Sequence, residues 1–291
     1  MPCADGLLVV DKPAGWTSHD VVARGRLVCG TRRVGHAGTL DPMATGVLLL
    51  GIGRATRLLG RLALTDKAYE ATIRLGQTTV SDDAEGEVID SVDAGGVTDD
   101  AIAGAVASLT GTIQQRPSAV SAIKIDGERA YRRVRAGEDV VLPARAVTVS
   151  RFEIEAVRRH AGLVDLDVQV ECSTGTYVRA LARDLGAMLD VGGHLTRLRR
   201  TRVGPYDLST AHALDALGAE PDVVPLDSAA EQCFPTYRVT PEQATAVRHG
   251  RAFAANLGAN GQVALFTETG GFLALYEQDG PRAKAVAVFT D

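Results

Sequence analysis

The chain has 291 residues, of which 45% are hydrophobic and 23% are charged. This composition is typical of a folded globular protein and excludes a mainly disordered or collagen-like chain, and the length predicts about two domains. No apolar run approaches the roughly 18 residues of a membrane span, and no basic residues precede the first apolar run, so we expect neither a membrane anchor nor a secretory signal. Four widely spaced cysteines predict reduced thiols in a cytoplasmic protein rather than a zinc site or a disulfide framework.

Charge is segregated along the chain, although the total is only −5. The segments 1–76 and 111–205 carry net charges of +4 and +5, whereas 77–110 and 206–291 carry −8 and −6. Arginine supplies 27 of the 31 basic residues, and its guanidinium suits bidentate contacts with phosphate and stacking on bases. The pattern allows a basic face for nucleic acid beside acidic segments, although ordinary surface ion pairs use the same residues.

The hydrophobic pattern alternates strands and helices without a regular βαβ rhythm. The first half predicts a strand over 6–11, a helix from Thr17 or Ser18 to near Gly30, a glycine-rich loop over 35–45 and a buried strand over 46–52. Further along it predicts a helix over 54–62, a half-buried strand over 67–75, an acidic loop-like segment over 77–100 and a helix over 98–109.

The second half begins with an apolar segment over 120–125, a turn at 126–127, a basic helix around 131–135, a strand pair over 145–158 and 163–172, and an amphipathic helix over 176–189. Three prolines and a loss of periodicity predict a linker over 218–236. Beyond it we expect a small β-rich module with a helix over 241–249 and strands over 262–267, 272–277 and 284–289.

The loop GHAGTLDPMATG, residues 35–46, is the first candidate for chemistry. Its glycines allow unusual backbone geometry, and Pro42 disfavours a helical conformation for Asp41. Asp41 is therefore displayed on a stiff loop before a buried strand, where it could act as a nucleophile or base without a metal. The structural alternative is an aspartate that hydrogen-bonds the amides of its own turn.

Three further features suggest contacts with an anion or a base. Arg179 falls in the first turn of its predicted helix, where a cation opposes the helix dipole, which indicates either a distant carboxylate or phosphate partner or a solvated arginine. The alternating arginines of residues 194–202 predict either a track for phosphates or a solvated strand face. Tyr69, on the apolar side of its strand, is either a core aromatic or a platform for stacking a base.

Several common signatures are missing from the sequence. It has no P-loop, no complete dinucleotide-binding glycine motif, no metal-ligand spacing among its six histidines and no GxSxG elbow. We therefore expect chemistry without nucleotide energy, hydride carriers or metals.

With GLLVVDKPAGWTSHDVV upstream, the loop GHAGTLDPMATGVL strongly resembles the bacterial tRNA pseudouridine-55 synthases of the TruB type. The resemblance continues through the Lys-Ala-Tyr at 67–69, SAIKIDGERAYRRVRAG from Ser121, STGTYVRALARDLG from Ser173 and HLTRLRRTRVGPY from His194. It covers about the first 205 residues, and its motifs occur in the family's order.

The resemblance implies an α+β fold with a mixed, mostly antiparallel sheet and flanking helices. It implies a pseudouridine synthase catalytic domain over 1–225 and a PUA-like RNA-binding domain over 236–291. It also implies an isomerase without cofactor or metal, which acts on uridine 55 in the T-loop of tRNA after flipping the base. We expect a cytoplasmic, monomeric protein whose partner is the tRNA T stem-loop, with no guide RNA and no membrane.

The family pattern also implies roles for individual residues. Asp41 would be the catalytic carboxylate, attacking the sugar C1′ or the base C6, or acting as a base toward a glycal. Arg179 would hold Asp41 ionised and aimed, and Lys12 would support the site from the first strand. The residues implied to contact the target nucleotide or the opened T-loop are Tyr69, Tyr177, Leu198 and His36.

The sequence departs from the family at two places. Arg-Pro-Ser-Ala follows Gln115 where relatives show a Pro-Pro-Tyr-like stretch, and the C-terminal segment 206–291 has 5 basic against 11 acidic residues. The competing hypotheses are a guide-RNA-dependent synthase subunit, an RNA-folding chaperone, and an unrelated hydrolase that uses Asp41.

Overall fold

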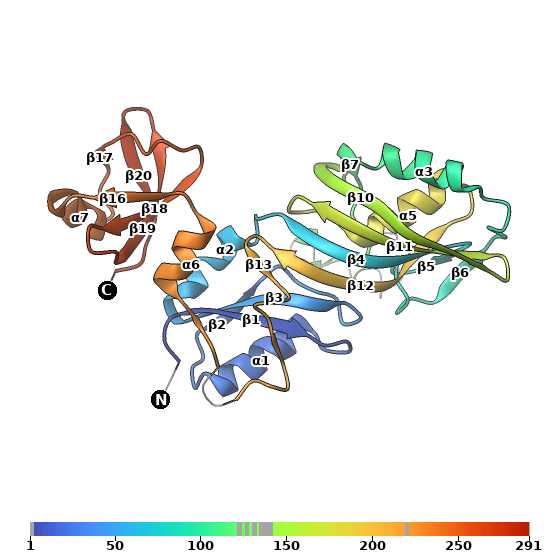
Figure 1. Cartoon of the computed structure of the whole chain (residues 1–291), viewed down its shortest axis with the longest axis horizontal. Coiled ribbons are helices and arrows are strands. Elements are labelled where there is room, and N and C mark those ends of the chain that lie inside the picture. The colour runs from blue at the N-terminus through green and yellow to red at the C-terminus, as the bar shows by residue number, and fades with distance from the viewer. Residues whose placement is uncertain are drawn as a thin grey trace.

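A computed structural model describes residues 3–120, 124–125, 128–129, 133, 142–218 and 221–290. The expected turn at 126–127 and, except for Arg133, the expected basic helix around 131–135 lie outside these residues. Figure 1 shows a large twisted sheet with α1, α3 and α5 packed on it, and a second, smaller sheet near the C-terminus.

The large sheet has eleven strands. They are β1 (Gly6–Lys12), β2 (Val34–Ala37), β3 (Thr45–Ile52), β4 (Lys67–Leu75), β7 (Gly111–Gln115), β10 (Arg145–His160), β11 (Leu163–Cys172), β12 (Gly193–Val203), β13 (Tyr206–Asp207), β14 (His212–Ala213) and β15 (Val224–Pro225). The main order is β14-β1-β3-β12-β4-β11-β10-β7. Only the β1–β14 and β3–β12 pairs are parallel, which confirms the expected mixed, mostly antiparallel sheet.

Threonine side chains cap three of the helices in the described residues, at Thr17, Thr98 and Thr240. The helices are α1 (Ser18–Val28), the 3₁₀ helix η1 (Gly53–Arg57), α2 (Leu59–Leu62), α3 (Asp99–Ser108), α5 (Val178–Met188), α6 (Leu226–Cys233) and α7 (Pro241–Arg248). Thr17 caps α1 in a reciprocal capping box with Asp20, which satisfies two free amides of the first turn. None of the helices within the described ranges is long and apolar enough to cross a membrane.

The remaining strands form one small sheet and two hairpins. The C-terminal sheet contains β16 (Thr236–Val239), β17 (Phe253–Ala254), β18 (Gln262–Thr267), β19 (Phe272–Asp279) and β20 (Arg282–Val288). The hairpins are β5 (Gln77–Thr79) with β6 (Val88–Ser91), and β8 (Lys124–Ile125) with β9 (Glu128–Arg129). The expected β-rich C-terminal module is therefore confirmed, and the division at 225 and 236 stays a prediction.

β1 and β3 are buried on both faces, which explains their nearly continuous apolar sequences. Leu8 and Val10 belong to a core cluster that includes Val21 and Val22 of α1. On the opposite face, Leu7 belongs to a second cluster. This cluster includes Leu226, Ala229 and Ala230 of α6, and Phe266, Phe272, Leu275 and Phe289 of the C-terminal module. The C-terminal module thus shares an apolar core with the N-terminal strands.

Two sequence expectations about loops are wrong. The expected linker over 218–236 contains β15 and α6, because Ala229 and Ala230 pack without solvent exposure into the second core cluster. The expected loop over 35–45 starts with β2, whose residues 34–37 pair with β3. In both places tertiary packing supplies the regularity that a short local pattern does not reveal.

The predictions for the arginines of residues 194–202 are also wrong for Arg200. β12 lies between β3 and β4 in the middle of the sheet, so half of its side chains turn into the protein. Arg200 is 1% exposed, and its Nε and Nη2 donate to the carbonyls of Val47 (2.7 Å) and Gly38 (3.0 Å). A buried guanidinium of this kind joins strands instead of binding phosphate or facing solvent.

We predict that Gly46→Ala destabilises the fold by more than about 2 kcal/mol. Gly46 has φ +100°, and an added Cβ would lie 2.1 Å from the carbonyl oxygen of Arg200, where β3 and β12 meet. Urea unfolding of the two variants measures the difference in free energy. Gly104→Ala is the matched control, because Gly104 lies in α3 with no atom near the added Cβ, and alanine there should stabilise by about 0.5–1 kcal/mol. Equal stability of the two variants would contradict the prediction.

Candidate active site

The Asp41 loop joins β2 to β3 and is held by contacts from three sides. The hydroxyl of Ser18 donates to the Leu40 carbonyl (3.0 Å) and accepts from its amide (2.9 Å). The Pro42 carbonyl accepts from the Gly15 amide (2.9 Å) and from Lys12 Nζ (3.2 Å). Because Ser18 and Lys12 are themselves buried and belong to α1 and β1, the loop presents Asp41 in a fixed direction.

The side chain of Asp41 meets Arg179, which lies in the first turn of α5. Arg179 Nε is 3.1 Å from Asp41 Oδ2, and the side chains of Arg179 and Asp41 are 7% and 37% exposed. Among the described residues, Asp41 is therefore oriented by a buried guanidinium rather than by the amides of its own turn. Its remaining exposure leaves one side of the carboxylate open to a ligand.

A second carboxylate, from Asp83, lies on the other side of Arg179. Asp83 Oδ2 is 3.4 Å from Arg179 Nη1, and its side chain is 3% exposed. Arg179 also donates to the carbonyls of Ser81 (2.7 Å) and Val120 (2.9 Å), so its nitrogens are well satisfied. The partners explain how a cation can be buried at a helix N-terminus, where the dipole opposes it.

Asp83 is a functional-site candidate that the sequence reading missed. It lies in the acidic segment 77–110, where eight carboxylates offer no local reason to select one. The single local signal is a turn motif: Asp83 Oδ1 accepts from Ser81 Oγ (2.5 Å) and from the Glu85 amide (3.1 Å). Such motifs are common in loops and do not predict proximity to α5.

Burial is the largest influence on the pKa of Asp41, and it raises that pKa above the ordinary value of 3.8. The charge of Arg179 opposes this shift, the carboxylate of Asp83 adds to it, and Lys12 lowers the pKa slightly. The site therefore balances a poorly hydrated carboxylate against one strong cationic partner. A carboxylate in this setting is more basic than one in water.

Asp41 opens onto a cleft of about 350 Å³. Tyr69 of β4 and Leu198 of β12 line this cleft and are 8% and 7% exposed. Burial raises the pKa of the Tyr69 hydroxyl, which interacts with Arg200, so the phenol is neutral at physiological pH. The cleft thus combines one carboxylate with an aromatic and an aliphatic side chain, a combination that suits a flat, weakly polar ring.

Tyr177 lies on the same cleft at the N-cap of α5. Its amide donates to Gln115 Oε1 (2.8 Å) and its carbonyl accepts from Gln115 Nε2 (3.1 Å), so one fully buried side chain clamps both main-chain groups. The Arg145 guanidinium carbon lies 5.1 Å from the centre of the Tyr177 ring. Neither Gln115 nor Arg145 was selected from the sequence, because both contacts join segments far apart in the chain.

Lys12 and His36 do not line this cleft. Lys12 is fully buried, and its Nζ donates to the carbonyls of Pro13 (3.0 Å), Trp16 (2.6 Å) and Pro42 (3.2 Å). Burial lowers the pKa of Lys12 to about 8. Lys12 therefore supports the Asp41 loop through the Pro42 carbonyl. Because the Lys12 side chain is fully buried, this position does not favour direct contact with a substrate.

His36 lies on β2, and its ring is 5.7 Å from that of His19 in an edge-to-face arrangement. Burial lowers its pKa, and its Nδ1 has no hydrogen-bond partner among the described residues. Within the described ranges, no group of three or more His, Cys, Asp or Glu residues is placed to hold a metal ion.

Comparison with known proteins shows that most of the chain matches domains of one enzyme family. Residues 26–178 match the family described as TruB family pseudouridylate synthase, N-terminal domain. Residues 179–228 match the tRNA pseudouridylate synthase B C-terminal domain, and 234–290 match the domain described as tRNA pseudouridine synthase II, C terminal. The cleft residues Asp41, Tyr69 and Tyr177 all lie within the first of these matches.

Similar proteins include tRNA pseudouridine synthase B of Rhodococcus jostii (strain RHA1), which is 59% identical and aligns over 97% of this chain and 93% of its own length. The protein of the same name from Nocardia farcinica (strain IFM 10152) is 61% identical over 97% of this chain and 92% of its own. A chain in the crystal structure of a Cbf5-Nop10-Gar1 complex superimposes with a TM-score of 0.71 and 26% identity, covering 98% of this chain and 85% of that one.

We predict that Gln115→Leu lowers the free energy of unfolding by about 1–3 kcal/mol, because it removes the acceptor of the Tyr177 amide and leaves the Tyr177 carbonyl with the Leu181 amide alone. Urea unfolding measures the loss. Gln114→Leu is the matched control: Gln114 is exposed on the same strand, so its substitution should change stability by less than about 0.5 kcal/mol. If both leucine variants unfold alike, Gln115 does not clamp the start of α5.

Proposed function

This chain belongs to the TruB family of pseudouridylate synthases, and on that premise we propose that it acts on uridine 55 in the T-loop of tRNA with Asp41 as the catalytic carboxylate. The chain is an isomerase that converts uridine in tRNA to pseudouridine, the activity of its family. The T-loop position is inferred from the family, and the role of each side chain is inferred from the family pattern and the site.

One observation carries the assignment to Asp41. Its partly exposed carboxylate is held 3.1 Å from the buried guanidinium of Arg179, beside a cleft lined by Tyr69, Tyr177 and Leu198. A base flipped out of the T-loop could stack on the tyrosine side chains, with its sugar directed to Asp41. RNA loops, whose bases are already partly unstacked, require less energy for such flipping than a duplex does.

The isomerisation is balanced without a cofactor. The bond between N1 of uracil and the sugar C1′ breaks, the base rotates, and a bond from C5 to C1′ forms. The proton on C5 is released and N1 gains a proton, so no net oxidation occurs. An ionised Asp41 serves each of the three routes considered: attack on C1′, attack on C6, or removal of a proton toward a glycal.

Other residues receive supporting roles in this proposal. Arg179 keeps Asp41 ionised and aimed, and Lys12 holds the carbonyl of Pro42 beside it. His36, which lies outside the cleft, would fill the space that the flipped base leaves in the T-loop. We assign catalysis to 1–225 and an accessory RNA contact to 236–291, where 5 basic residues are balanced by 5 acidic ones.

We propose that the enzyme acts without a guide RNA and as a monomer in the cytoplasm, where tRNA is modified. The relatives named tRNA pseudouridine synthase B are 59% and 61% identical to it, far closer than the chain from the Cbf5-Nop10-Gar1 complex.

Two other functions fit the site less well. A hydrolase of the acid protease kind needs a second accessible carboxylate, and the nearest candidate, Asp83, is 2% exposed behind Arg179. A pure RNA chaperone has no need for a carboxylate whose charge is balanced at the mouth of a cleft. Catalysis explains the arrangement more completely.

Asp41→Asn should reduce tritium release from tRNA labelled with [5-³H]uridine by at least about 10³-fold, because an amide cannot serve as nucleophile or base. Binding of an unmodified tRNA transcript should stay within a few-fold of the wild-type value, since the two side chains have the same shape. Turnover by the asparagine variant would refute the assignment, and rescue of tRNA maturation in cells by that variant would favour the chaperone.

The acid limb of single-turnover rates should lie above pH 3.8, because burial raises the pKa of Asp41 and only its ionised form reacts. Asp83→Asn removes a negative charge that raises this pKa, so it should move the limb toward lower pH. Circular dichroism at each pH separates unfolding from titration. An acid limb at or below 3.8 in the wild-type enzyme, or a shift of the variant toward higher pH, would contradict this electrostatic description.

A further inference from the structure

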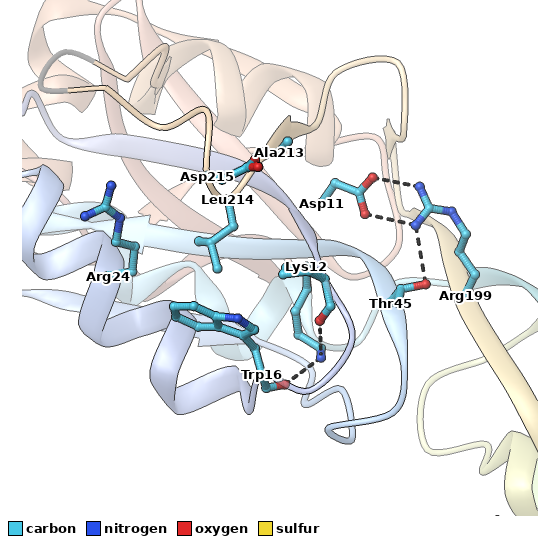
Figure 2. A pocket seen from close by; sticks show the side chains of 10 residues that line it. Asp11, Lys12, Trp16, Arg24, Thr45, Arg199, Ala213, Leu214 and Asp215 are labelled. Carbon is cyan, nitrogen blue, oxygen red and sulfur yellow. Dashed lines mark hydrogen bonds and ion pairs between the residues drawn. The ribbon is translucent and has the colours of Figure 1, made fainter. Parts of the chain in front are cut away.

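A second cavity, of about 680 Å³, adjoins the catalytic loop. Figure 2 shows it between the segment 11–16, α1 and the segment 213–215. Arg199 lines this cavity and its neighbour Arg200 lines the cleft, so the two spaces lie on the two faces of β12. The cavity is therefore distinct from the site that holds Asp41.

One wall of the second cavity is an exposed indole. Trp16 is the single tryptophan of the chain, and it is 40% exposed although it neighbours Leu214, which is 4% exposed. Both residues line the cavity, and in Figure 2 Leu214 lies above the Trp16 ring. A large aromatic surface left open in this way suits a planar ring of a ligand.

The charged groups around the indole differ in how fully they are paired. Asp11 and Arg199 form a two-point ion pair, at 2.7 and 3.1 Å, which needs no further partner. Among the described residues Arg24 has a single, long hydrogen bond to the Leu217 carbonyl (3.4 Å) and no ion pair, and exposed Asp215 has no ion pair. A guanidinium and a carboxylate thus keep free hydrogen-bonding capacity beside the ring.

The cavity is also connected to the catalytic loop by Lys12. The Trp16 carbonyl and the Pro42 carbonyl both accept from Lys12 Nζ, and Pro42 follows Asp41 directly. A ligand that orders Trp16 would therefore stabilise the support of Asp41. This link makes a ligand related to the reaction more consistent with the cavity than an unrelated peptide.

We propose that the second cavity binds a nucleobase, which stacks on Trp16 while Arg24 contacts its phosphate and Asp215 accepts from its amino or imino groups. An exposed indole beside a free cation and a free carboxylate matches a planar ring that has both donors and a charged backbone. The base comes either from the bound RNA, outside the target uridine, or from a free nucleotide. The RNA source rests on the proposed function.

Fluorescence of Trp16 tests the proposal, because emission excited at the red edge of tryptophan absorption comes from this cavity alone. The full chain carrying Asp41→Asn is titrated with an unmodified tRNA transcript, a T-arm hairpin and each of the four nucleoside 5′-monophosphates. We expect saturable quenching. Quenching by RNA alone identifies the RNA as the source, and saturable quenching by a monophosphate identifies a free nucleotide. Unchanged emission with every probe, while filter binding shows bound RNA, overturns the proposal.

A pair of substitutions distinguishes stacking from apolar packing. Trp16→Leu keeps an apolar side chain but loses the stacking surface. Filter binding for RNA, or equilibrium dialysis for a monophosphate, should show that the ligand which quenches wild-type Trp16 binds this variant about tenfold more weakly. Trp16→Phe should restore most of that loss. Equal affinity of the leucine variant and the wild type, with thermal unfolding showing both folded, would exclude a stacked base.

Failure of this proposal is separable from failure of the proposed function. If the cavity binds no base, wild-type tritium release from labelled tRNA remains intact and only the Trp16 results are negative. If the proposed function is wrong, the wild-type chain releases no tritium, whatever Trp16 reports. Quenching by a monophosphate would then still support a nucleotide site.

Discussion

The site depends on the burial of one arginine between two carboxylates. Arg179 is 6% exposed, and a buried cation without partners would be several kcal/mol unstable, so Asp41 and Asp83 must stay beside it. The two acids arrive from different loops and the arginine from α5. The same charge balance therefore fixes three segments of the fold and leaves only Asp41 open to solvent, which separates the reactive carboxylate from the structural one.

Much of the fold could be predicted because its signals are local. The alternation in 67–75 and the capping residue Thr17 predict β4 and α1 directly, and both are present. The position of β12 could not be predicted, because its arginines look polar in sequence while Arg200 finds carbonyl partners on β3 and on the Asp41 loop. Likewise α6 is short, and its apolar side chains pack against β1 and β19.

The sequence is a better guide to the reactive residue than to its supports. Asp41 stands out because glycine and proline surround it, and the family resemblance adds Tyr69, Tyr177, Arg179 and Leu198, which all line one cleft. Asp83 and Gln115 act through long-range contacts that have no local pattern. Lys12 and His36 lie outside the cleft, a distinction that depends on which way each side chain points from its strand.

The apolar cluster that joins α6 and the C-terminal sheet to β1 and β3 has a consequence for folding cooperativity. Leu7 and Val9 of β1 share that cluster with Phe272 and Phe289, and the guanidinium of Arg57 donates to the Val288 carbonyl (2.7 Å). Loss of the C-terminal sheet would expose the face of β1 that carries Leu7 and Val9 to solvent. The C-terminal module is thus a structural part of the chain's N-terminal half, and we expect the two to unfold as one cooperative unit.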